Sequence, residues 1–139
     1  WGQAFVDHKT IDKINILQAS LLAMKNAYEK MLEKFPDWAK IHGLENAEQT
    51  DFLAIADGLY VPEIKCESKA VVKADAKYSA VMAASIIAKV SRDHKMLEYD
   101  SLYPEYGYAK HKGYPTKAHK EICKKLGPSP IQRLSFSYR

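Results

Sequence analysis

The sequence has few cysteines, and the two it has, Cys66 and Cys123, are far apart with no paired spacing. This usage disfavours a disulfide framework or a zinc site built from cysteine pairs, and it suits a reducing, cytoplasmic setting. The sequence also lacks an apolar run long enough to cross a bilayer, and it lacks the basic, apolar and small-residue pattern of a signal peptide. We therefore expect a cytoplasmic protein without a membrane partner.

Internal repeats, low-complexity stretches and a strong charge of one sign are absent as well. The net charge is +4 and the pI about 8.9, which fits a nucleic-acid partner but is shared by many unrelated proteins. A length of 139 residues predicts a single domain, with a core over about 1–100 and a helical and loop segment over about 101–139, and we expect a monomer. The chain begins at Trp1 in a pattern typical of folded structure, so we expect it to be a piece of a longer protein.

Hydrophobic periodicity predicts an α/β order of elements. Apolar residues recur at three- and four-residue spacing from Ile14 to Phe35, and Pro36 is expected to end this helix. A second helix begins near Ser79, and its many alanines would let it approach a sheet closely. The remaining pattern predicts strands at 1–6, 52–56 and 70–73 and a short helix near 11–14. It also predicts a loop with at most a short turn of helix at 37–51, a last helix from Pro115 to Leu126 and a C-terminal loop to Arg139.

Two aspartates follow predicted strands. The run at 52–56 is apolar on every side, which is typical of a buried parallel strand, and it ends at Asp57; the strand at 70–73 is followed by Asp75. Neighbouring strands would bring these carboxylates together at the sheet edge where α/β proteins bind ligands, and Mg²⁺ or Mn²⁺ would then offset their repulsion. Two alternatives stay open from the residues alone: Asp75 caps the following helix, or both are unrelated turn aspartates.

Basic residues gather in two further places. The segment 110–114 interleaves lysine, histidine and tyrosine beside a glycine, which suits a loop that contacts a nucleic-acid backbone. Lys89, Arg92 and Lys95 share one face of the predicted second helix. A solvated basic loop and a solvated helix face are the alternatives for these two groups.

Five blocks in order resemble the ribonuclease HII family and cover nearly the whole chain. They are Ile14–Met24, Val72–Asp75, Ala83–Asp93, His111–Thr116, and Gly127–Pro130 followed by Ser135 and Phe136. The resemblance implies a ribonuclease-H-like mixed sheet flanked by helices, here truncated at its N-terminus and followed by a C-terminal helical segment. It also implies an endonuclease of DNA replication and repair, which cleaves the RNA strand of RNA–DNA hybrids and cuts at ribonucleotides embedded in duplex DNA.

The resemblance further assigns residues. The family uses four carboxylates to hold two Mg²⁺ or Mn²⁺ ions for phosphodiester hydrolysis, and Asp57 and Asp75 resemble the third and fourth of these. Tyr114 resembles the tyrosine that packs at the ribose and helps to read its 2′-hydroxyl. The expected phosphate contacts are Lys73, Lys77, Lys89, Arg92, His111 and Lys112.

The sequence departs from the family pattern where the first two carboxylates should be. The family opens with a strand that carries an adjacent Asp-Glu pair, and nothing like it occurs in these 139 residues. With two of four ligands, cation binding should be weak, so we expect the chain alone to be inactive. A catalytically dead nucleic-acid-binding remnant and a metal-free structural module are the alternative functions.

Overall fold

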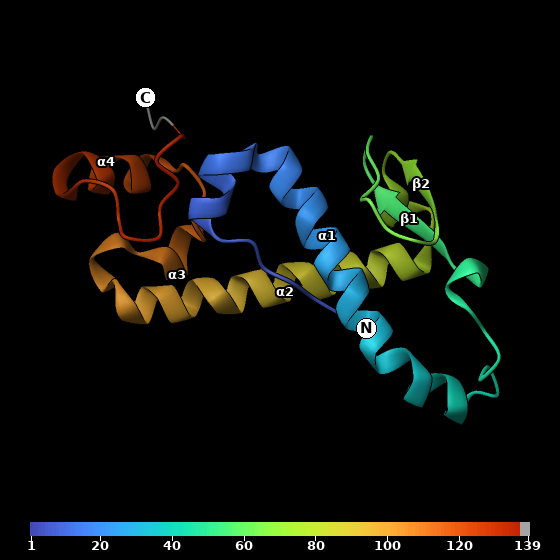
Figure 1. Ribbon diagram of the computed structural model, residues 1–139. Coiled ribbons are helices and arrows are strands. Elements are labelled where there is room, and N and C mark those ends of the chain that lie inside the picture. Colours follow the sequence, from blue (N-terminus) through green and yellow to red (C-terminus); the bar gives the residue numbers. More distant parts are fainter. Residues whose placement is uncertain (137–139) are drawn as a thin grey trace.

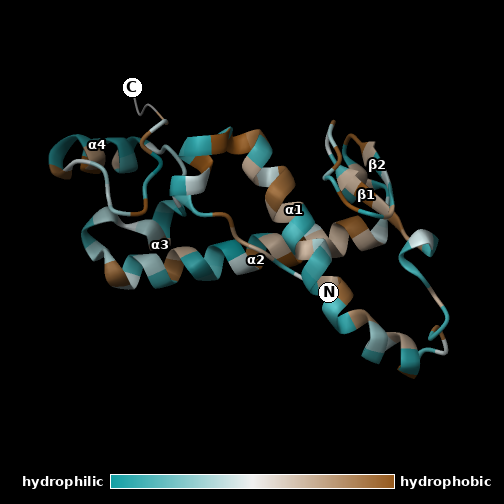
Figure 2. Cartoon of the chain, viewed as in Figure 1, coloured by the Kyte–Doolittle hydropathy of each residue, from teal (hydrophilic) through white to brown (hydrophobic). Residues whose placement is uncertain are grey.

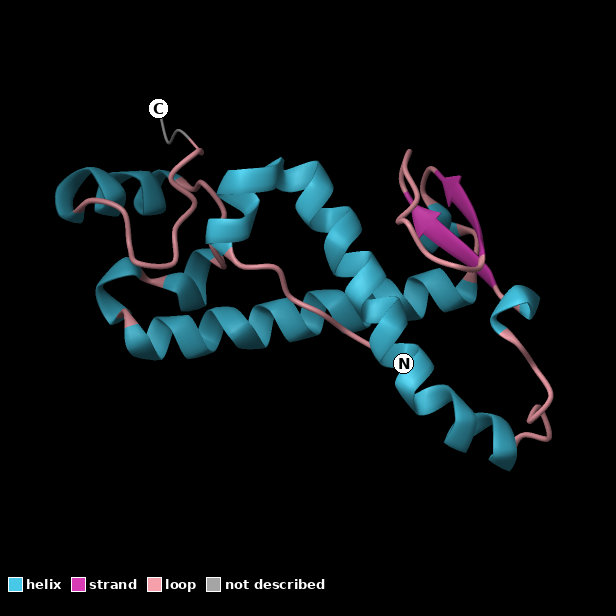
Figure 3. Ribbon diagram, in the orientation of Figure 1, coloured by secondary structure: helices cyan, strands magenta, loops and turns pink. Residues whose placement is uncertain are grey.

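The computed structural model describes residues 1–136 and shows an α/β protein, which confirms the predicted fold class (Figure 1). Helices predominate, and the two strands lie together at one end of the molecule (Figure 3). No helix in this range is both long and apolar enough to cross a membrane. The elements in chain order are α1 (His8–Ile41), η1 (Gln49–Asp51), β1 (Leu53–Asp57), β2 (Glu67–Val71), η2 (Ala74–Ala76), α2 (Ser79–Leu102), η3 (Pro104–Tyr106), α3 (Tyr108–His111) and α4 (Lys117–Leu126).

The sheet is small. Strands β1 and β2 pair in parallel, and the last pair in their register is Asp57 with Val71. The parallel pairing agrees with the apolar run at 52–56, but the expected burial does not, because Leu53 is exposed and only Ala56 is buried. Strand β2 begins and ends earlier than predicted. It cannot continue to residue 73, because Lys73 has a left-handed φ of 55°.

Helix α2 connects the two ends of the molecule. Its first turns contact β1 and η2, and its last turns contact η3 and α3. Figure 2 shows an apolar first half and a more hydrophilic second half of this helix. The predicted close approach of its alanines to a sheet does not occur among the described residues, because Ala80, Ala83, Ala84 and Ala88 are all exposed.

Helix α1 is longer than the sequence predicts. It runs to Ile41 with Pro36 inside it, so the prediction that Pro36 ends the helix is wrong. Proline costs this helix one backbone hydrogen bond, and the remaining turns continue around the gap. The short helix expected near 11–14 forms the first turns of α1, with Asp7 as its N-cap, and Asn15 separates it from the rest of the helix (φ 68°, ψ 168°).

The predicted strand at residues 1–6 is also wrong. This segment has no strand partner among the described residues, and it runs between α1 and α2 (Figure 1). Gly2 lies so close to α1 that a Cβ there would stand 2.2 Å from the carbonyl oxygen of Ala27. On the other side, the hydroxyl of Ser91 on α2 donates to the side chain of Gln3. Contacts with two helices therefore replace the sheet ladder.

Helix α4 forms close to its predicted bounds, and the loop after it returns to the start of α1. Thr116 caps α4, and Gly127 follows its last residue with φ 82°. In the loop beyond, the backbone N–H groups of Leu134 and Ser135 donate to Asp12 of α1 at 2.8 and 3.1 Å. Residues 137–139 of the predicted C-terminal loop lie outside the described part of the chain.

Candidate active site at the strand ends

Asp57 stands at the carboxyl end of β1 and is tied to the next turn of the chain. Its Oδ1 accepts a hydrogen bond from the backbone N–H of Ala74 at 2.9 Å. Ala74 is fully buried and is the first residue of η2, and Lys73 before it adopts its left-handed conformation to make this turn. The carboxylate of Asp57 therefore fixes the segment that follows β2 against the end of β1.

Asp75 is the residue directly after Ala74, so the same hydrogen bond brings it to the strand edge where Asp57 lies. The alternative that Asp75 caps the following helix is wrong, because the N-cap of α2 is Tyr78 and no side chain caps it. Asp75 is half-buried and Asp57 is exposed. The structure thus places both predicted metal ligands at the carboxyl edge of one parallel sheet.

The donor set fits a hard divalent cation in kind but not in number. Carboxylate oxygens are the ligands that Mg²⁺ and Mn²⁺ prefer, and Oδ1 of Asp57 is already engaged by the amide of Ala74. Across residues 1–136, no three or more histidine, cysteine, aspartate or glutamate side chains group so that they would hold a metal ion. These two aspartates would therefore supply part of a cation site.

The lysines of the candidate site are arranged around the first part of α2. Lys73 and Lys77 flank η2, and both are exposed beside Asp75. Lys89 is exposed on α2 and forms an ion pair with Asp93 at 3.1 Å. A phosphate at Lys89 would have to compete with this carboxylate, whereas Lys73 and Lys77 have no such ion pair among the described residues.

Arg92 and Tyr114 meet at a second position on α2. The guanidinium of Arg92 lies over the ring of Tyr114, 5.0 Å from its centroid. Tyr114 is 56% exposed, and Lys112, two residues earlier, is half-buried with a left-handed φ of 50°. Nη1 of Arg92 is buried and has no hydrogen-bond partner, so a donor of this guanidinium is unused within the described chain.

The placement of His111 argues against its predicted phosphate contact. The side chain is 8% exposed, its Nε2 lies 2.7 Å from the carbonyl oxygen of Tyr106, and its Nδ1 accepts from the N–H of Gly113 at 3.1 Å. Both ring nitrogens are therefore engaged inside the protein. His119, which the sequence analysis missed, stacks on this ring; the only signal for it was its position three residues after the capping Thr116.

The structure does not bring the carboxylates and Tyr114 together. Arg92, on which Tyr114 stacks, follows Ser79 by about three and a half helical turns, or about 20 Å of helix axis. Asp57 and Asp75 lie before the first turn of α2. The candidate site therefore has two parts on one helix, an acidic end and an aromatic, basic part further along it.

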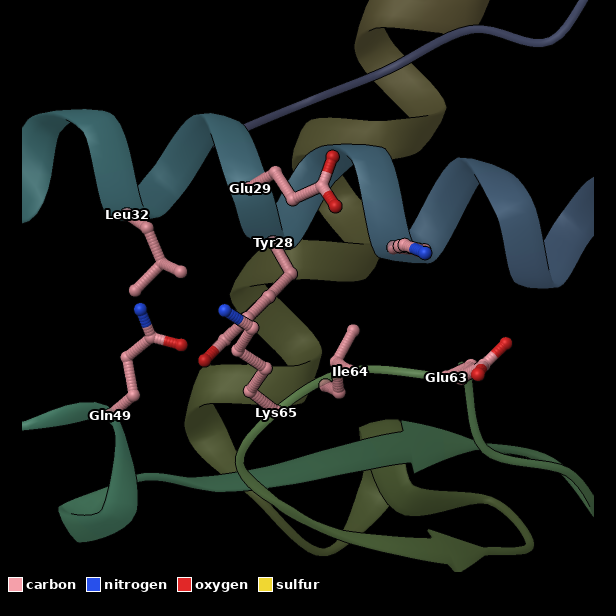
Figure 4. A pocket seen from close by; sticks show the side chains of 8 residues that line it. Tyr28, Glu29, Leu32, Gln49, Glu63, Ile64 and Lys65 are labelled. Atoms are coloured by element: carbon pink, nitrogen blue, oxygen red, sulfur yellow. The ribbon is translucent and has the colours of Figure 1, made fainter.

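A groove between α1 and the segment before β2 is separate from both parts (Figure 4). None of the predicted site residues lines it. Burial, and then the neighbouring thiol of Cys66, raise the pKa of its Tyr28 to about 12. The phenol is therefore neutral at physiological pH, and the groove offers no activated base there.

The α/β order and the parallel strand pair are consistent with the class of ribonuclease-H-like folds, and the comparisons with known proteins specify the family. The family model for ribonuclease HII matches residues 2–138. This chain belongs to the ribonuclease HII family.

Three curated relatives bear the same name. Ribonuclease HII of Treponema denticola is 49% identical over 138 residues, 98% of this chain and 68% of the relative. That of Borrelia hermsii is 45% identical over 136 residues, 97% of this chain and 66% of the relative. That of Natranaerobius thermophilus is 43% identical over 136 residues, 98% of this chain and 61% of the relative. The chain thus spans between 61 and 68% of the length of these relatives.

Proposed function

We propose that this chain carries the second half of the catalytic site of an endonuclease, which hydrolyses the RNA strand of RNA–DNA hybrids and cuts at ribonucleotides in duplex DNA. The observation that carries the proposal is the hydrogen bond from Ala74 to Asp57, since it holds Asp75 at the same strand edge as Asp57. Membership of the ribonuclease HII family supports this reading of the pair.

In this proposal Asp57 and Asp75 are two ligands of Mg²⁺ or Mn²⁺. A divalent cation at such carboxylates polarises a phosphate oxygen and lowers the pKa of bound water. In the proposed site the strand edge holds the two carboxylates, and the exposed Lys73 and Lys77 flank the turn that carries Asp75. The positive charges of these two lysines would attract the scissile strand and orient its phosphates.

The substrate contacts extend along α2. About 20 Å of helix axis corresponds to about six base pairs, so a duplex that lies along α2 reaches both the acidic end and Tyr114. We propose Tyr114 as the ribose contact, and Lys89, Arg92 and Lys112 as phosphate contacts. We also propose that residues 1–100 and 101–139 act as one domain, because α2 runs without a break across their boundary.

A nucleic-acid-binding protein without catalysis is the second candidate. It is favoured by one observation, that the described residues group no third acidic ligand with Asp57 and Asp75. We propose that the 139-residue chain by itself is inactive for this reason, and that activity returns when the segment of a relative that lies outside the match is supplied.

A nicking assay tests the proposal. The substrate is duplex DNA with one ribonucleotide in Mg²⁺ or Mn²⁺, and the chain is tested alone and mixed with the unmatched segment of the Treponema denticola relative. We expect cutting only in the mixture. Asp57→Asn or Asp75→Asn should lower the rate by more than the roughly 100-fold that loss of an outer-sphere partner costs, since each removes a direct ligand.

Asp37→Asn is the control for these variants, because it removes an exposed carboxylate on α1 that is outside the candidate site. Robust cutting by the chain alone would show that the inactivity is wrongly assigned. Full activity of the Asp57 and Asp75 variants in the mixture would refute the ligand assignment. Binding of the duplex without cutting in any mixture would favour the second candidate.

A further inference from the structure

Two imidazoles are stacked inside the C-terminal part of the protein. The ring centroids of His111 on α3 and His119 on α4 are 4.0 Å apart, with an angle of 11° between the planes. Their side chains are 8% and 1% exposed, and Tyr108 packs its ring edge-on against both. Burial lowers the pKa of His119, and the neighbouring His111 adds to this effect, so the neutral ring is favoured.

The hydrogen bonds fix which ring nitrogens carry protons. A carbonyl oxygen can only accept, so Nε2 of His111 donates to Tyr106, and Nδ1 of His119 donates to the carbonyl of Tyr114 at 3.0 Å. The N–H of Gly113 donates to Nδ1 of His111, which must therefore be unprotonated. The pair is set as an Nε2–H tautomer next to an Nδ1–H tautomer.

Both rings bond the backbone of one short turn, residues 112–116, which we call the Tyr114 turn. His111 accepts from Gly113, and its own carbonyl accepts from the N–H of Tyr114 at 2.8 Å. His119 donates to the carbonyl of Tyr114. The backbone N–H of Tyr114 is therefore bonded by a residue of α3, and its backbone carbonyl by a residue of α4.

The Tyr114 turn is also packed closely against α2. Gly113 has φ 79°, and a Cβ there would stand 3.5 Å from Nη2 of Arg92 and 3.6 Å from Sδ of Met96. The ring of Tyr114 lies over Arg92 on the same helix, yet 56% of the residue stays exposed. Three helices thus converge on an aromatic side chain that still faces outward.

We propose that His111 and His119 are positioning residues, whose buried rings fix the Tyr114 turn through their hydrogen bonds, so that the exposed phenol ring is held ready for a ribose. The pair does not touch the nucleic acid; it acts through Tyr114. The proposal rests on the proposed function in one respect, that Tyr114 contacts the ribose of the substrate.

The chain offers a matched pair of variants at one position. In His111→Asn, the amide oxygen lies near the place of Nδ1 and can still accept from Gly113, whereas the donor to Tyr106 is lost. In His111→Gln, the longer side chain can keep the donor to Tyr106 but not the acceptor for Gly113. Both variants lose the ring stack, so they differ in the bond to the Tyr114 turn.

Nuclear magnetic resonance of the ¹⁵N-labelled 139-residue chain, without substrate, decides the positioning role. We expect the Nε2–H tautomer for His111 and the Nδ1–H tautomer for His119. His111→Gln should speed amide hydrogen exchange at Gly113 and shift the ring signals of Tyr114, and His111→Asn should leave both close to wild type. The control His94→Gln changes an exposed histidine of α2 and should alter neither.

Duplex binding gives the functional readout. The ratio of affinities for duplex DNA with and without one ribonucleotide should fall about tenfold in His111→Gln, the effect of one lost hydrogen bond, and should be kept in His111→Asn. A wild-type chain with the expected tautomers but no ribonucleotide preference would contradict the proposed role of Tyr114 and leave the packing role of the pair established. The opposite tautomers, or equal effects of the two variants on Tyr114, would overturn the positioning proposal itself.

Discussion

At the residue scale, the carboxylate of Asp57 is part of the fold as well as of the candidate site. One of its oxygens bonds the amide of the buried Ala74, and this bond orders the left-handed turn that carries Asp75. The sequence predicted that both aspartates follow strands. It could not exclude that Asp75 caps the following helix, because capping depends on the residue at which α2 begins. In the structure α2 begins at Ser79 with Tyr78 as its N-cap, so Asp75 is too early in the chain to cap it.

Lys112 gives a residue-scale prediction that depends only on charge. Lys112→Gln should weaken duplex binding similarly for all sequences and should reduce the slope of log Kd against log salt concentration by about 0.9, because one phosphate contact fewer releases fewer counterions. Fluorescence titrations of a labelled duplex at several salt concentrations measure the slope.

Lys40→Gln is the matched control for this prediction, since Lys40 is exposed near the end of α1 and outside the candidate site. An unchanged slope in Lys112→Gln would remove Lys112 from the phosphate contacts. A drop of the same size in both variants would point to net charge rather than to a specific contact.

At the element scale, the break in α1 shows how one residue divides a helix. Asn15 has a backbone conformation that is open mainly to glycine, and its side-chain oxygen accepts from the N–H of Gln18 at 3.1 Å. It therefore ends the first turns of α1 and caps the long part that follows. The sequence predicted from periodicity alone that the long helix starts at Ile14. In the structure its long part starts only after Asn15, because Asn15 is the cap.

Substitutions at Asn15 should separate the strain from the cap. Asn15→Gly and Asn15→Ala both remove the cap, but only alanine must also bear the strained backbone. We expect Asn15→Ala to be less stable than Asn15→Gly by about 1 kcal/mol or more, as measured by urea denaturation.

The exposed Glu33, in the interior of the same helix, provides the control. There the order should reverse, with Glu33→Ala more stable than Glu33→Gly by about 1 kcal/mol, because glycine is the poorer helix former. If the alanine variant were more stable than the glycine variant at both positions, the backbone of Asn15 would not be strained in solution.

Elements whose signals are local were predicted well, and elements that need a partner were not. Helix α2 begins at the expected Ser79 and α4 ends at the expected Leu126, since alanine-rich propensity, Thr116 and Gly127 act within or directly beside the helix itself. The segment at 1–6 alternates like a strand, yet a strand needs a neighbour to pair with. In this structure α1 and α2 take that place.

At the scale of the whole molecule, many large apolar side chains are exposed to solvent. Met82, Ile86 and Val90 follow one another at four-residue spacing on α2, and 47–58% of each is exposed. Leu53 of β1 is exposed as well, and the sheet has only two strands within residues 1–136. A two-stranded sheet is marginally stable unless other elements pack on it.

This surface predicts binding of an apolar dye. The 139-residue chain should enhance the fluorescence of anilinonaphthalene sulfonate under native conditions, because contiguous exposed apolar side chains offer it a site. The double variant Met82→Lys and Ile86→Lys should lower this signal while the far-ultraviolet circular dichroism keeps its helical content.

The matched control is the pair Lys124→Ala and Lys125→Ala on α4, which changes charge away from this face and should leave the dye signal unchanged. A native wild-type chain without dye fluorescence would show that the apolar face of α2 is covered in solution, for instance by a second copy. Size-exclusion chromatography of the same sample would then test the expected monomer.

The sequence by itself determined the α/β class, the family and the two aspartates at the strand ends, because helix propensity, apolar runs and ordered motifs are properties of neighbouring residues. Only the tertiary structure decided what those residues touch. It showed that Ala74 bonds Asp57, that His111 is buried against His119, and that about 20 Å of α2 separates the acidic end from Tyr114. Burial and hydrogen-bond partners depend on elements far apart in the chain, and no local pattern specifies them.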